Sequence, residues 1–192
     1  MKYLYSLLAG FSIGIAAICF LKGGQLVGAA LFSFGLSAVV YSKWPLFTGM
    51  AGFFGTRREF AALWPMLLAN AAGTAAATLM AIDMNLAEAA STLVEIRVSR
   101  GFAGCLLPAV GCGFIMSVSV KYARKGQWIP LLLGIPTFVM CGFPHCVADI
   151  AYYSIAPRGV EMLWPWLGTV AGNFIGCNIP VFDRFMQKEK AV

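Results

Sequence analysis

The chain has 192 residues, of which 60% are hydrophobic and 11% are charged, and its mean hydropathy is +0.80. So few polar residues cannot cover a water-soluble globule, which excludes that class and indicates an integral membrane protein. The formal net charge of +6 comes from basic residues scattered over short loops, so it requires no nucleic-acid partner.

Nearly charge-free runs follow one another along the whole sequence. A transmembrane helix needs about 20 apolar residues, and the first run is too long for a signal peptide and leads directly into the second. We therefore predict an all-α protein with six membrane spans in a single domain, residues 1–192. The runs cover residues 3–21, 23–42, 60–82, 101–120, 126–148 and 162–182.

The second run is interrupted at Trp44 and Pro45. Proline lacks a backbone donor and restricts the residue before it, so the helix is expected to stop there and resume as a short helix over residues 50–54. Lys43 beside this break either extends to an interface or supplies positive potential near a cavity. After the third run, residues 82–100 are expected to form a partly helical external loop.

The fifth run breaks at residues 142–144 (Gly-Phe-Pro), beside His145, the only histidine. A half-helix is expected to resume over residues 145–155. Membrane helices tolerate such breaks only where the freed backbone groups face protein or a water-filled cavity, and an ionisable residue there is a functional candidate. The alternative is a kinked helix with a buried, hydrogen-bonded histidine.

The two halves of the sequence correspond. The second span of each half is broken at a proline, and the third carries Asn-x-x-Gly, beginning at Asn70 and at Asn173. Three spans per half is an odd number, so we predict an inverted 3+3 repeat over about residues 1–82 and 101–186. Its two broken helices meet near the midplane, where half-helix N-termini favour a small anion.

Basic residues near the span ends predict the orientation. With the N-terminus in the cytoplasm most of them lie inside, so both termini are expected to be cytoplasmic. The inside set is Lys2, Arg57, Arg58, Lys121, Arg124, Lys125, Arg184, Lys188 and Lys190, and the outside set is Lys22, Arg97, Arg100 and Arg158.

All six cysteines lie inside apolar runs and none forms a Cys-x-x-Cys pair, so we expect neither disulfide nor metal site nor cofactor. Of the six cysteines, only Cys146, next to His145, is a candidate pore-lining residue. An intramembrane enzyme is disfavoured, because one histidine without paired aspartates or a Ser-His arrangement leaves little catalytic machinery.

Three stretches resemble signatures of the formate/nitrite transporter family of bacterial anion channels: residues 46–49, 138–148 and 172–176. They occur in the family's order and spacing over nearly the whole chain, which looks like a short member without the N-terminal extension. The resemblance implies an aquaporin-like fold and a homopentamer in a bacterial inner membrane. It also implies transport of formate, nitrite, hydrosulfide, lactate or a related anion, often with a proton.

The resemblance also implies site residues. His145 matches the central pore histidine, Thr48 the hydroxyl facing it, and Asn173 the asparagine that steadies the broken segments. Two hydrophobic slits are implied, a cytoplasmic one of Phe32 and Leu36 and a periplasmic one of Leu46, Phe47 and Phe138; ordinary packing is the alternative for these five residues.

The sequence departs from the family pattern at four points. Pro144 replaces a glutamate, Asp149 an asparagine and Pro108 another asparagine. The external lysine that attracts anions has no match, and Arg97 or Arg100 is expected to replace it. Asp149 either touches the pore or pairs with Lys43, an arginine or backbone at the rim.

Desolvation opposes passage of an anion through a dry slit, whereas the neutral acid avoids most of that cost. A histidine between two slits either carries a charge and passes on a proton, or stays neutral and shapes the potential. We therefore predict a proton-linked channel for the small monovalent anion of a weak acid. Formate, nitrite, hydrosulfide, acetate and lactate all fit this description.

Two other functions remain open at this point. A neutral-solute pore of the water or glycerol type fits the implied fold, although neither break contains the Asn-Pro-Ala pair of such pores. A structural membrane subunit would give no flux in liposomes.

Overall fold

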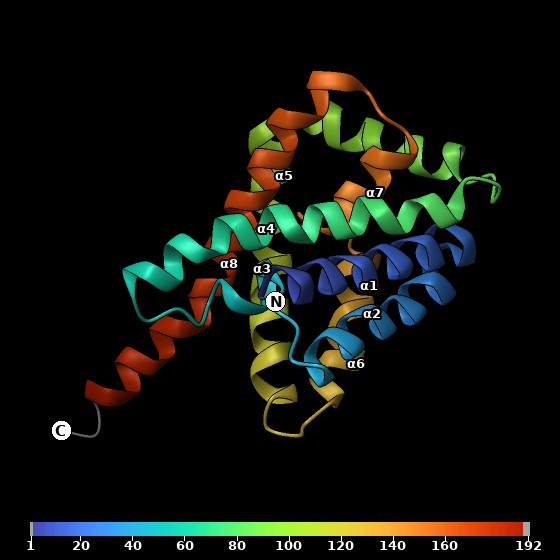
Figure 1. Cartoon of the computed structure of the whole chain (residues 1–192). Coiled ribbons are helices and arrows are strands. Elements are labelled where there is room, and N and C mark those ends of the chain that lie inside the picture. The colour runs from blue at the N-terminus through green and yellow to red at the C-terminus, as the bar shows by residue number, and fades with distance from the viewer. Residues whose placement is uncertain (1, 190–192) are drawn as a thin grey trace.

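A computed structural model describes the backbone of residues 2–189 and the side chains of residues 3–180. Arg184, Lys188, Lys190 and the side chain of Lys2, which entered the predicted orientation, lie outside these described side chains. Every regular element in the described part is helical (Figure 1). The α-helices are α1 (Lys2–Gly23), α2 (Ala29–Tyr41), α3 (Phe47–Met50), α4 (Arg57–Thr78), α5 (Ala87–Ala123), α6 (Ile129–Met140), α7 (Ala148–Ile155) and α8 (Leu163–Glu189).

Three stretches are long and apolar enough to cross a membrane: Tyr3–Tyr41, Arg57–Ala81 and Ala87–Ala123. The first of them is folded back on itself. Gly24 has a φ of +69°, which glycine adopts without steric cost, and α2 returns along α1. The two helices are tied by the Ser12 hydroxyl, which donates to the carbonyl of Gly35 over 3.0 Å.

Residues 82–100, predicted as a partly helical loop, are helical from Ala87 onward as the first part of α5. Ala90, Val94 and Arg97 are buried and lie three or four positions apart, so this segment has one inward face of helical period. Gly101, with φ +60° and ψ −164°, then interrupts the helix. The parts of α5 before and after it run in different directions (Figure 1).

The same helix contact occurs in each half of the chain. Helix α1 packs along α4, and α5 packs along α8. A Cβ atom on Gly10 would lie 1.9 Å from the carbonyl oxygen of Asn70, and one on Gly113 would lie 2.2 Å from that of Asn173. Only glycine therefore allows these backbones to approach so closely.

Both broken segments end their first helix in the same way. At the end of α6, the Gly142 N–H donates to Val139 and the Phe143 N–H to Phe138, which is a Schellman motif with a left-handed residue at its end. That residue is Gly142, with a φ of +66°, and Pro144 follows. Helix α7 begins only at Ala148, so His145 lies before the half-helix and not at its start as predicted.

The first break repeats this motif at the end of α2. The Lys43 N–H donates to Val40 and the Trp44 N–H to Val39, and Pro45 follows as Pro144 does. Lys43 has a φ of +56°, which is unfavourable for a residue with a side chain. Helix α3 begins at Phe47, earlier than the short helix that the sequence predicts.

Exchanging the residue types at these two turns is expected to move stability in opposite directions. Lys43→Gly removes a left-handed residue with a side chain and should raise the free energy of unfolding by about 1 kcal/mol. Gly142→Ala should lower the free energy of unfolding by about 1–2 kcal/mol, because it introduces a side chain at a left-handed position. Thermal unfolding of both variants in one detergent checks this, and a change of the same sign in both would contradict it.

Candidate functional site

The two breaks meet at one hydrogen bond. Thr48 lies in α3, after the first break, and His145 lies in the second. Their Oγ1 and Nε2 atoms are 2.9 Å apart, and the residues are 0% and 2% exposed. Two segments that are distant in the sequence therefore place a hydroxyl and an imidazole together inside the protein.

A second contact assigns the tautomer of His145. The backbone N–H of Ala148 donates to His145 Nδ1 over 3.1 Å, so Nδ1 must carry a lone pair in this geometry. The proton of the neutral ring is then on Nε2, which donates to the Thr48 hydroxyl. A doubly protonated ring would direct the Nδ1 proton at the Ala148 N–H, so it would have to break that contact.

Asn173 holds the second break in place. Its Nδ2 donates to the carbonyl of Pro144 over 3.0 Å, and its Oδ1 accepts the N–H of Cys146 over 2.8 Å. These two groups flank His145. Nδ2 also donates to Ala109 in α5 over 3.0 Å. This is the geometry that a steadying role requires.

Asn70 makes the same three contacts at the first break. Its Nδ2 donates to the carbonyls of Pro45 and Ser6, and its Oδ1 accepts the N–H of Phe47. The asparagine and its helix partner are 64 positions apart in both halves. One arrangement thus fixes both breaks.

Asn173→Ala is expected to lower the free energy of unfolding by about 2–3 kcal/mol, because it leaves buried groups at Pro144 and Cys146 without partners. The matched control is Asn178→Ala, one turn later in α8, whose amide bonds are only partly buried. We expect the control to cost about 1 kcal/mol. Equal losses in a denaturant or thermal titration would contradict this role for Asn173.

The apolar residues predicted to form slits line two different cavities. Phe32 and Phe138 meet edge-on with ring centroids 6.0 Å apart, and Phe138 stacks on His145 at 5.9 Å. All three line a cavity of about 30 Å³, which is the space of about one water molecule. Leu36 and Leu46 instead line a second cavity of about 580 Å³.

This grouping differs from the two slits inferred from the sequence. Phe32 lies against Phe138 and not with Leu36, and Leu46 shares the large cavity with Leu36. Phe47 packs on Trp64 of α4, with centroids 6.1 Å apart, and lines neither cavity. Phe32 and Leu36 are one turn apart on α2 and share a face, yet they line different cavities.

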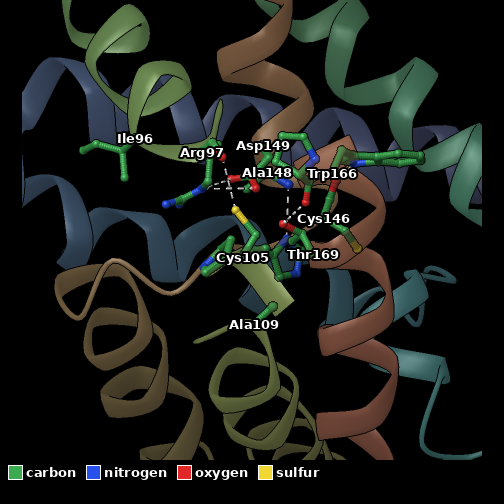
Figure 2. A network of polar contacts seen from close by, with 12 residues as sticks. Ile96, Arg97, Cys105, Ala109, Cys146, Ala148, Asp149, Trp166 and Thr169 are labelled. Atoms are coloured by element: carbon green, nitrogen blue, oxygen red, sulfur yellow. Dashed lines mark hydrogen bonds and ion pairs between the residues drawn. The ribbon is translucent and has the colours of Figure 1, made fainter. Parts of the chain in front are cut away.

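A buried ion pair lies beside the smaller cavity. Arg97 and Asp149 are 5% and 1% exposed, and Arg97 Nε lies 3.4 Å from both carboxylate oxygens. Arg97 Nη1 also donates to the carbonyl of Gly142 over 3.4 Å. Figure 2 shows the two side chains facing each other, with Cys105 next to them donating to the carbonyl of Arg97. Of the two alternatives for Asp149, pairing with an arginine is present, and both members of the pair also line the cavity.

The other predicted residues lie apart from this centre. Cys146 is fully buried in the core, where its carbonyl accepts from Trp166 (Figure 2), and it does not line the small cavity. Arg100 is exposed and lines neither of the two cavities. Lys43 is exposed and lines the large cavity; its extension to a membrane interface stays a prediction.

Two residues of α8 near Thr48 were missed by the sequence reasoning. The Cys177 thiol donates to the Thr48 carbonyl over 3.2 Å, and the Asn178 amide donates to that of Ala51 over 3.0 Å. They donate to the Thr48 and Ala51 carbonyls at the C-terminal end of the short helix α3, where carbonyl groups lack intrahelical partners. Their spacing of about one turn from Asn173 was the available signal.

Two solved structures have a fold similar to that of this chain. The chain is similar to a pentameric formate channel with formate bound, with a TM-score of 0.84 and 17% sequence identity, over 98% of this chain and 96% of that one. It is also similar to an FNT family ion channel, with a TM-score of 0.73 and 16% identity, over 97% and 89%. No protein-family model and no curated protein matches the sequence. The resemblance seen in the sequence is thus confirmed for the fold.

Proposed function

We propose that this chain forms a membrane pore for the small monovalent anion of a weak acid, such as formate, nitrite or hydrosulfide, and that a proton accompanies the anion. The observation that carries the proposal is the buried Thr48–His145 hydrogen bond in a chain with the fold of a formate channel. We propose that Phe32 with Phe138, and Leu36 with Leu46, form two apolar constrictions on either side of this pair. A channel of this kind performs transport and no enzymatic reaction.

The constrictions determine which form of the substrate crosses. Phe32 with Phe138 and Leu36 with Leu46 offer no polar side chain to an ion, so the neutral acid meets the lower barrier. A proton from the aqueous phase joins the anion on one side, the acid crosses, and the proton is released on the other side. His145 Nε2–H and the Thr48 hydroxyl supply hydrogen bonds between the constrictions, with the ring neutral at rest.

Arg97 is proposed as the cation that draws anions to the outer side. It lines the small cavity with His145, whereas Arg100 does not. Its guanidinium is paired with Asp149, so the buried positive charge is compensated. The guanidinium Nη2 has no hydrogen-bond partner among the described residues, so it can donate to an anion. In the predicted orientation the Phe32–Phe138 constriction is then periplasmic, and the Leu36–Leu46 constriction is cytoplasmic.

We further propose that the two halves form an inverted repeat of six spans in a bacterial inner membrane, with both termini in the cytoplasm. The matched contacts of Asn70 and Asn173, and of Gly10 and Gly113, support two equivalent halves. A homopentamer is proposed from the assembly of the similar formate channel.

Uptake by proteoliposomes tests the proposed function. Purified protein should accelerate uptake of formate, nitrite and hydrosulfide well above empty liposomes, and uptake should rise as the external pH falls because more of each anion is protonated. Glycerol permeability should be unchanged. Accelerated glycerol uptake without anion uptake would favour a neutral-solute pore, and no flux of any solute would favour a structural subunit.

A further inference from the structure

The large cavity has the dimensions of a binding site for an organic molecule. Its volume of about 580 Å³ falls within the range of small-molecule pockets, and it greatly exceeds what an anion of three atoms requires. Leu36, Leu46 and Leu63 form part of its wall and are each 1% exposed. The deep end is therefore apolar, next to the proposed Leu36–Leu46 constriction.

The rim of this cavity carries more positive than negative charge. Lys43, Arg124 and Glu59 line it. The Glu59 carboxylate accepts the backbone N–H groups of Gly55 and Thr56 over 2.8 and 3.1 Å, so it caps helix α4. Neither Lys43 nor Arg124 forms an ion pair within the described residues.

Among the described residues, neutral groups hold Arg124 in one orientation. Its Nη2 donates to the carbonyl of Gly49 over 3.1 Å and lies 3.3 Å from the Met50 sulfur. Its guanidinium carbon lies 4.6 Å above the centre of the Phe53 ring. These contacts use Nη2, and a guanidinium has five N–H donors, so a fixed positive group with further donors stands at the edge of an apolar cavity.

We propose that this cavity binds an organic carboxylate with an apolar body, such as a medium-chain aliphatic acid. The carboxylate lies at Arg124 and Lys43, and the hydrocarbon lies against the leucine wall. Each methylene that becomes buried should tighten binding about fourfold, which sets this ligand apart from formate. The proposal concerns the cavity itself and does not depend on transport; where transport occurs, the bound acid would block the Leu36–Leu46 constriction.

Tryptophan fluorescence provides a direct binding assay, because Trp44 and Trp128 both line the cavity. We expect the purified protein in detergent to show a saturable change on titration with hexanoate. 1-Hexanol and hexylamine, which match its length without the negative charge, should bind at least about tenfold more weakly. Formate should bind more weakly than hexanoate.

Variants of the basic residues test whether Arg124 binds a carboxylate or only stabilises the structure. Arg124→Gln should raise the Kd for hexanoate about tenfold or more, and Lys43→Gln should raise it several-fold. Lys121→Gln is the matched control, because Lys121 is basic and close by in α5 but does not line the cavity. If Arg124→Gln fails to fold, the Kd of Lys43→Gln and the comparison of hexanoate with hexanol still test whether the cavity binds a carboxylate.

Equal affinity for hexanoate and hexanol, or an unchanged Kd in both folded cavity variants, would overturn the carboxylate site. The assay requires no flux. Saturable hexanoate binding by a protein that transports nothing would therefore count against the proposed pore alone, and transport without such binding would count against this site alone.

Discussion

Replacing Asp149 with leucine is expected to lower the free energy of unfolding by about 3–5 kcal/mol. The carboxylate is 1% exposed and is the opposite charge that Arg97 contacts. Without it, a guanidinium that is itself buried keeps its charge and loses its compensation. Thermal or denaturant unfolding of the purified variant in detergent measures the loss.

The double variant Arg97→Met with Asp149→Leu is the control for this prediction. Replacing both members of a buried pair with apolar residues is often nearly neutral, so the double variant should be clearly more stable than Asp149→Leu alone. Arg158 and Glu95 form the second ion pair among the described residues, and it is exposed. Glu95→Leu should cost less than about 1 kcal/mol. A double variant less stable than the single one would show that the charges do not compensate each other.

Replacing His145 with alanine is expected to reduce formate and nitrite uptake by at least about tenfold at neutral pH. The variant removes the Nε2–H donor between the two constrictions, and an unsatisfied polar group in a dry passage costs roughly 1–3 kcal/mol. Uptake should still rise as the pH falls, because in the proposed route the anion takes its proton from the aqueous phase and not from His145. Stopped-flow uptake into proteoliposomes at two pH values measures both effects.

Thr48→Val is the matched variant, because it keeps the shape of the side chain and removes only the hydroxyl that contacts His145. We expect a smaller loss than in His145→Ala, with the pH dependence retained. Equal uptake in wild type and His145→Ala, with both proteins folded, would remove His145 from the transport route.

Much of the fold follows from the sequence because its signals are local. The two prolines and the apolar runs predict where helices α2 and α6 end, and both helices end just before those prolines. Residues 82–100 were predicted as a partly helical loop, and the structure shows more helix there than expected, from Ala87 onward, since charged residues such as Glu88 and Glu95 hide the spacing of Ala90, Val94 and Arg97. Only packing against the rest of the chain shows that this segment is a helix with one buried face.

The contacts within the site could be predicted less well from the sequence, because they join segments that are distant in the sequence. The approach of Thr48 to His145 was expected from family resemblance, whereas the Arg97–Asp149 pair joins residues 52 positions apart and appeared only as one alternative. The sequence reasoning grouped Phe32 with Leu36, whereas in the structure Phe32 contacts Phe138. Residues one turn apart on a helix can face different cavities, which no periodicity separates.

The ratio of protons to formate ions taken up by wild-type proteoliposomes tests the central claim most directly. If the substrate passes the Phe32–Phe138 and Leu36–Leu46 constrictions as a neutral acid, one proton should enter with each formate, with no net current. A formate current without proton uptake would contradict passage as the neutral acid.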